Sequence, residues 1–336
     1  MKKQWGLLVL GLIVVMVLAA CGGGSSNESE GDTEEGGNVP VKIGLSTWVG
    51  YAPMYVADEK GFFEENGVDM DLVKIEGVGD RRSALAAGEI DGFASTVDTH
   101  IVTEASGIPV VQIFAMDDSY GGDGIVSTTD INSIQDLKGK DVAVQTDGGA
   151  SFFWFMYLLD QEGIETDEIN LQNMSAGDAG ASFVSGKVDA AVTWEPWLTN
   201  AKETDFGQVL MSSDETPGVI ADAVAVSKEF ADANPEAIEG MVKAWYQAIE
   251  FWKENPDEAN EIMAQAMGQT VEEFEVSLEG VRFYGEEENK EYFGTKENPG
   301  KISELSNLAV EFWYEQGIID NQPDAEATIG YEYIAE

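Results

Sequence analysis

The chain has 336 residues, 43% of them hydrophobic and 24% charged, which is enough for two domains with buried cores. Its 18 Lys and Arg residues face 63 Asp and Glu residues, a formal net charge of −45. This charge excludes nucleic acid and an anionic membrane surface as natural partners of the folded part.

The N-terminal segment predicts export and lipid anchoring. Lys2 and Lys3 precede an apolar run over 7–20, which is long enough for a secretory signal but too short to span a bilayer. The run ends in Leu18-Ala19-Ala20-Cys21, which resembles a lipobox with the lipid on the cysteine sulfur. The alternative is an unlipidated or unprocessed leader. Cys21 is the only cysteine, so no internal disulfide can form.

Residues 22–39 are rich in Gly, Ser, Asn and Glu, and predict a flexible tether between the anchor and the folded part. Removing the signal with its two lysines leaves 16 basic residues against 63 acidic ones, a charge of about −47. The acids are spread over predicted helices, so we expect a solvated acidic surface, for which a saline or alkaline habitat is one hypothesis.

The first part of the chain alternates strands and helices, which predicts βαβ units. Arg81 and Arg82 are expected at a solvated helix start, and 117–124 reads as a glycine-rich acidic loop at a strand tip. Strands are predicted over 41–45, 68–75, 90–94 and 110–114, and helices over 52–60, 82–87 and 98–106.

The second part continues the rhythm and then becomes helical. We expect crossings between two lobes at 125–127 and 223–227, which gives lobe 1 as 41–124 plus 224–336 and lobe 2 as 125–223. Lobe 2 has predicted strands over 141–145, 188–192 and 207–211 and an aromatic helix over 152–160. Extra C-terminal helices are predicted over 235–255, 256–267, 271–281 and 301–316.

One pattern occurs twice: a helix, a glycine stop, a short strand and a polar strand tip, at 83–96 and 178–197. The copies match Gly88 with Gly186, Ile90 with Val188, Asp91 with Asp189 and Ser95 with Thr193. This repeat predicts two similar α/β lobes. Ligands of such sheets bind beyond the carboxyl ends of the strands.

Several stretches resemble the substrate-binding proteins of nitrate, sulfonate and taurine ABC importers. They are 44–72 with its run Tyr51-Ala-Pro-Met-Tyr-Val-Ala-Asp-Glu-Lys-Gly-Phe-Phe-Glu-Glu-Asn-Gly67, Ala86-Ala-Gly-Glu-Ile-Asp91, Asp136-Leu-Lys-Gly-Lys140, Gly186-Lys-Val-Asp-Ala-Ala191 and Trp194-Glu-Pro-Trp197. The likeness covers most of 41–255. It implies a periplasmic-binding-protein type II fold, hinge closure on a small solute, and delivery to an ABC permease. With the lipobox, it implies a lipid-anchored monomer on the outer face of a cell membrane, in the Gram-positive form of the family.

The candidate ligand contacts share a position at the carboxyl end of a predicted strand. They are Ser46, Thr47, Trp48, Ser95, Thr96, Asp98, Asp118, Tyr120, Asp123, Thr146, Ser151, Trp194 and Glu195. Four of these are acids, two are tryptophans, and none is Lys or Arg, a set that favours a small nitrogen-containing cation or zwitterion. The alternative for each acid is a turn former.

Two other functions stay open. An aliphatic sulfonate, taurine or nitrate is the family's usual kind of solute, and the helix start at 148–151 could hold an anion unless Asp147 caps it. Relatives of the fold also make the pyrimidine of thiamine, which requires an iron site rich in His and Cys. The single histidine, His100, reads as a packed helix residue, so we expect no metal, no cofactor and no enzyme activity.

Overall fold

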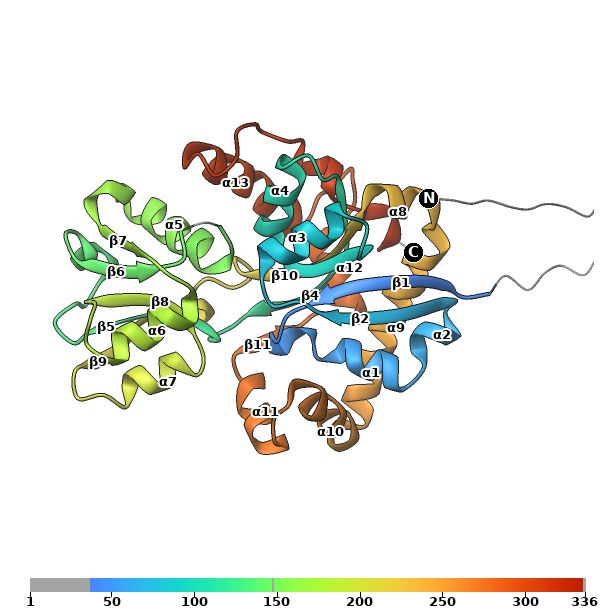
Figure 1. The fold of residues 1–336 in the computed structure, drawn as a ribbon, viewed down its shortest axis with the longest axis horizontal. Coiled ribbons are helices and arrows are strands. Elements are labelled where there is room, and N and C mark those ends of the chain that lie inside the picture. Colours follow the sequence, from blue (N-terminus) through green and yellow to red (C-terminus); the bar gives the residue numbers. More distant parts are fainter. Residues whose placement is uncertain (1–36, 147, 335–336) are drawn as a thin grey trace, which may run out of the picture. The chain divides into compact units, whose positions relative to one another are not determined.

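The structure is a computed structural model that describes residues 37–146 and 148–334 (Figure 1). The chain from Gly37 onward forms one compact unit. The predicted signal, the lipobox with Cys21, nearly all of the tether, and Asp147 lie outside the described residues. Within the described part, no helix is long and apolar enough to cross a membrane.

The first sheet has six strands in the order β11-β4-β10-β3-β1-β2. Strand β1 (Val39–Leu45) shows why such segments pair: Val41, Ile43 and Leu45 are fully buried and alternate with exposed Lys42. The other strands are β2 (Val68–Lys74), β3 (Gly92–Thr96), β4 (Val110–Ser119), β10 (Ala221–Ser227) and β11 (Val281–Phe283). β1, β2 and β3 run parallel, and β10 is antiparallel to both β3 and β4.

Helices from both ends of the chain pack over this sheet, as Figure 1 shows. The N-terminal set is α1 (Pro53–Glu59), α2 (Phe62–Glu65), α3 (Val78–Ala86) and α4 (Val97–Ala105). The C-terminal set is α8 (Lys228–Ala233), α9 (Pro235–Glu254), α10 (Pro256–Met267), α11 (Val271–Leu278), α12 (Glu286–Phe293) and α13 (Lys301–Glu315). α1 contacts α9 and α10, and α4 contacts α13, so the extra C-terminal helices complete the core of the first lobe.

The second sheet has five strands in the order β7-β6-β8-β5-β9. They are β5 (Asp123–Thr128), β6 (Asp141–Val144), β7 (Asn170–Asn173), β8 (Ala190–Trp194) and β9 (Gly207–Ser212). The helices of this lobe are α5 (Ala150–Glu162), α6 (Ala176–Val184) and α7 (Trp197–Lys202). The two sheets thus form two α/β lobes, as predicted.

The repeated pattern forms the same hydrogen bonds in both lobes. The Asp91 carboxylate accepts the backbone N–H of Lys42 at 2.8 Å, and the Asp189 carboxylate accepts that of Asp141 at 3.0 Å. The backbone N–H of Asp91 in turn donates to the carbonyl of Lys42, and that of Asp189 donates to the carbonyl of Asp141. Gly88 and Gly186 both have φ +69°, a left-handed conformation that favours glycine.

The connections between the sheets differ from the prediction. Residues 125–127 lie inside β5 and 223–227 inside β10, so both segments are sheet strands, while the chain passes between sheets at 120–122 and 213–220. The predicted loop at 117–124 is mostly strand, because antiparallel pairing with β10 and β11 carries β4 on to Ser119. The exact lobe boundaries stay a prediction.

One C-terminal helix is shorter than predicted. The helix expected over 271–281 ends at Leu278, and Val281–Phe283 forms β11 on the edge of the first sheet. Gly280 lies at the break, and its carbonyl accepts the backbone N–H groups of Tyr120 and Gly122. This segment therefore holds the first connection between the two sheets.

Candidate ligand-binding site

The candidate site lies where β1, β3 and β4 end and β10 begins. Thr96, Asp222 and Asp117 are direct partners across β3, β10 and β4, so their side chains project from the same face of the sheet. Directly opposed residues of antiparallel strands have Cβ atoms about 5 Å apart. Two carboxyl groups, those of Asp117 and Asp222, therefore lie side by side in the interior.

Aromatic donors hold this carboxyl pair. The indole Nε1 of Trp48 donates to Asp117 Oδ1 at 2.9 Å, and the hydroxyl of Tyr51 donates to Asp222 Oδ1. Both donors come from the segment that follows β1, with Tyr51 closing the short helix η1 (Val49–Tyr51). Gly50 lies between them, and a Cβ there would overlap the Asp117 carboxylate. The close approach explains why this position is glycine.

Three further acids are buried near the pair. Asp98 lies in the first turn of α4, Asp118 follows Asp117 on β4, and Asp123 opens β5. Their exposed fractions are 2%, 2% and 4%. Asp118 Oδ2 accepts the backbone N–H of Gly218 at 2.8 Å, which ties the second connection to β4. We call these three residues with Asp117 and Asp222 the aspartate cluster.

Burial raises the pKa of every member of the aspartate cluster. Loss of hydration is the main cause in each case, and it raises the pKa of Asp222 to about 7 and those of Asp98 and Asp123 to about 6. Asp117 is fully buried, and its pKa rises well above the usual value through burial and then the charge of Asp222. The pKa of Asp118 is raised, again by burial.

Several cluster oxygens have no hydrogen-bond donor. Asp98 Oδ2, Asp117 Oδ2 and Asp118 Oδ1 are all closed off from solvent and unpartnered. A buried acceptor left unpaired costs about 1–3 kcal/mol, and more for a charged group. The site is therefore short of donors and of positive charge.

Positive charge near the cluster comes from Arg282 and Lys301, whose charges lower the pKa of Asp118, and from the buried Arg81. Arg81 is 3% exposed and is the single Lys or Arg buried in the described part of the chain. The expectation of a solvated Arg81 is wrong: it lies within α3, and its guanidinium donates to the backbone carbonyls of Ile75 and Glu76. Its charge lowers the pKa of Asp222, but less than burial raises it.

The other predicted contacts of lobe 1 have varied surroundings. Thr96 is buried and bonds Thr99, while Thr47 is exposed and donates to Glu76. Ser95 is buried, one residue along β3, so strand alternation directs it to the other face. Ser46 is half-buried. Tyr120 lies under Arg282, whose Cζ is 3.1 Å from the ring centre.

The predicted contacts of lobe 2 are exposed or half-buried, apart from Ser151, which is buried. Glu195 is exposed, and its carboxylate accepts the backbone N–H and hydroxyl of Thr199 at 3.0 Å each. Trp194 is 38% exposed and pairs with Asp123 across β8 and β5. Thr146 is half-buried and its N–H donates to Asn173, while Ser151 is 5% exposed at the start of α5.

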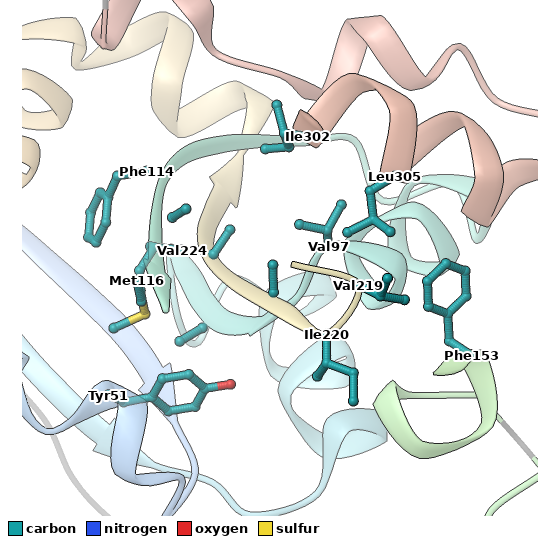
Figure 2. Close-up of a cluster of buried hydrophobic side chains, with 14 of the residues drawn as sticks. Tyr51, Val97, Phe114, Met116, Phe153, Val219, Ile220, Val224, Ile302 and Leu305 are labelled. Atoms are coloured by element: carbon teal, nitrogen blue, oxygen red, sulfur yellow. The ribbon is translucent and has the colours of Figure 1, made fainter. Parts of the chain in front are cut away.

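Tyr51 also belongs to a cluster of buried apolar side chains that includes Met116, Ile220 and Val224, as Figure 2 shows. Across the lobes, α5 and α13 meet through aromatic rings. The ring centre of Trp313 lies 5.9 Å from that of Phe152 and 5.6 Å from that of Phe153. The Trp313 indole also donates to the backbone carbonyl of Asp98 at 3.3 Å. This aromatic contact is therefore linked directly to the aspartate cluster.

His100 lies on α4, fully buried. Its Nε2–H donates to the carbonyl of Ala223 at 3.0 Å, and its ring packs on Phe93. Burial lowers the pKa of His100 to about 4, so the ring is neutral. Among the described residues, no group of His, Cys, Asp and Glu could hold a metal ion.

Sequence reasoning missed Asp117, Asp222, Tyr51 and Arg81 as site residues. Asp117 stood next to a predicted contact, in a segment interpreted as a loop. Asp222 stood in an apolar run, Ala221-Asp-Ala-Val-Ala-Val226, where a lone acid in a strand was an available signal.

Residues 48–259 match the model of the family described as NMT1/THI5 like. The chain belongs to this family. A Bacillus subtilis protein named as a candidate aliphatic sulfonates-binding protein is 28% identical over 269 residues, which cover 78% of this chain and 77% of that protein. The taurine-binding periplasmic protein of Escherichia coli is 26% identical over 223 residues, or 65% of this chain and 68% of the other.

Solved structures agree on the fold. The periplasmic aliphatic sulphonate binding protein SsuA of Escherichia coli superposes with a TM-score of 0.72 at 19% identity, over 88% of this chain and 98% of the other. The predicted fold class and family are thereby confirmed. These relatives are named as binding proteins, in agreement with the prediction that the chain is not an enzyme.

Proposed function

We propose that this solute-binding protein of an ABC importer captures a small nitrogen-containing cation or zwitterion between its lobes and delivers it to the permease. The observation that carries the proposal is the imbalance of buried charge: five aspartates against one arginine. A buried anion without a partner is costly, and a cationic ligand would supply the missing charge.

The ligand would make its closest contacts with the aspartate cluster, which lies on the first sheet and its helices apart from Asp123 at the start of β5, and be covered by lobe 2. Asp98, Asp118 and Asp123 were predicted as contacts and belong to the aspartate cluster. Trp194 and Glu195 lie more exposed, as suits groups that reach a ligand only when the lobes close. Lipid anchoring through Cys21 on the outer face of the membrane and the monomeric state belong to the same proposal.

An aliphatic sulfonate or taurine is the second candidate, because two relatives are named for these solutes. The charges of the site weigh against a simple sulfonate, since each nearby carboxylate would repel it in a medium of low dielectric constant. Taurine differs from a simple sulfonate, because its ammonium group could face the carboxylates.

Three compounds with the same two-carbon chain separate these functions by isothermal titration calorimetry of the mature protein. They are ethylammonium, which is a cation, taurine, which is a zwitterion, and ethanesulfonate, which is an anion. Binding of ethylammonium or taurine without ethanesulfonate supports the proposal. Micromolar binding of ethanesulfonate or nitrate, with no response to ethylammonium or taurine, would favour the second candidate in its anionic form.

A further inference from the structure

We propose that Asp117 and Asp222 form the element that selects the ligand, by exchanging a shared proton for a cation that carries N–H groups. This inference rests on the proposed function. The two aspartates recognise the charge of the ligand, and they accept one chemical class. Ammonium, amidinium and guanidinium groups fit this description, whereas quaternary ammonium ions and anions do not.

The geometry of the pair makes full ionisation unfavourable when no ligand is present. Asp117 and Asp222 face each other across antiparallel strands, and like charges directly opposite each other destabilise a sheet. Each carboxyl group receives one aromatic donor, from Trp48 or Tyr51, and none of the ion pairs among the described residues includes either aspartate. Two carboxyl groups so placed retain a proton between them.

The remaining acceptors define what the ligand must offer. Asp98 Oδ2 is unpartnered in a side chain that is 2% exposed, and Asp117 Oδ2, which packs against Gly50, is unpartnered in a side chain with no exposed surface. A ligand with N–H groups would donate to such oxygens and replace the proton as the source of positive charge. A quaternary ammonium ion brings the charge but no donor, so these acceptors would stay unpaired.

The surroundings of the pair place the exchange near neutral pH. The titratable and charged groups around it come from each neighbouring element: Asp98 of α4, Asp118 of β4, Asp123 of β5, Tyr51 of η1, Arg81 of α3, Tyr284 next to β11 and Tyr292 of α12. The acids favour retention of the proton, Arg81 opposes it, and burial raises the pKa of Asp222 to about 7. A bound cation would lower that pKa and expel the proton to solvent.

The test is calorimetry of the mature protein with ethylammonium in two buffers of different ionisation enthalpy. We expect release of close to one proton per ligand at pH 6 and almost none at pH 8.5, with affinity rising up to about tenfold per pH unit until pH 7 and then levelling off. Tetramethylammonium should bind at least tenfold more weakly than ethylammonium. Asp222→Asn, which keeps an acceptor for Tyr51, should lose at least tenfold in affinity and most of the proton release at pH 7, where Asp98 and Asp123 are already largely ionised.

Controls separate this inference from the proposed function. Asp205→Asn removes an exposed carboxylate outside the site and should leave both proton release and affinity unchanged. Ethylammonium binding with no proton release at pH 6, or tetramethylammonium binding as tightly, would overturn the inference and leave the proposed function standing. Binding of ethanesulfonate alone would overturn both. The proton count on the unaltered protein decides the matter even if Asp222→Asn does not fold.

Discussion

Asp222→Asn should stabilise the ligand-free protein at pH 8 and leave it nearly unchanged at pH 4. The folded state raises the pKa of Asp222 from 3.8 to about 7, so folding favours the protonated form. Stability from such a group is fully present below its unfolded pKa and is lost as pH rises through the folded pKa. At pH 8 the ionised side chain opposes folding, and a neutral amide does not.

The size of the effect follows from the pKa. A pKa difference of about 3 units between the folded and unfolded states corresponds to roughly 4 kcal/mol at 1.36 kcal/mol per unit. This value is an upper figure, because Asp117 shares the titration. The amide retains an oxygen for the Tyr51 hydroxyl, so this hydrogen bond should survive. We therefore expect a gain of about 1–4 kcal/mol in the free energy of unfolding at pH 8.

Urea denaturation of the mature protein without ligand, at pH 4 and pH 8, measures this difference. Asp205→Asn is the matched control, since it removes the same charge from an exposed position. Because the whole chain is strongly acidic, only a gain beyond that of the control counts. Equal stability of Asp222→Asn and the unaltered protein at pH 8, or a loss at both pH values, would refute the description of Asp222 as a buried acid short of positive charge.

Four other predictions address the site, the hinge and the anchor. Gly50→Ala should cost about 1–3 kcal/mol in unfolding experiments, because its methyl group would overlap Asp117. Glu195→Gln should weaken ethylammonium binding about tenfold in calorimetry, since this exposed carboxylate is proposed to reach the ligand when the lobes close; unchanged affinity would show that it makes no contact with the ligand. Small-angle scattering should give a smaller radius with ligand, and Trp313→Leu should reduce this change by removing contacts to α5. Cys21→Ala should release the protein from membranes in a fractionation experiment, and retention would argue against the lipid anchor.

The scaffold could be predicted because its signals are local. The helix, glycine stop and strand of each repeat lie within about fifteen residues, and each repeat forms the same hydrogen bonds through Asp91 or Asp189. Gly88 and Gly186 were predicted as helix stops, and both adopt the left-handed conformation that ends a helix. Most strands and helices were therefore predicted to within a few residues.

The centre of the site could not be predicted in this way, because antiparallel pairing between distant segments creates it. Asp117 and Asp222 are more than one hundred residues apart, and Tyr51 meets Asp222 from a separation of 171 residues. No local sequence pattern predicts which acidic residue will pair with a residue of an antiparallel strand far away in the chain. Arg81 was misjudged for a similar reason: its helix position was local information, whereas its burial depends on the packing of α3 on the sheet.

The residues that carry the family likeness and those proposed to recognise the ligand's charge lie at opposite ends of the same strand, β3. Asp91 precedes β3 and binds β1 there, whereas Thr96 ends β3 beside Asp222. The motif around Asp91 stabilises the amino end of β3 and does not determine which residues stand at the carboxyl end of that strand. One scaffold can therefore carry carboxylates where another carries donors for an anion. For this chain, the charge of the solute must be inferred from the aspartate cluster, and the names of its relatives cannot decide it.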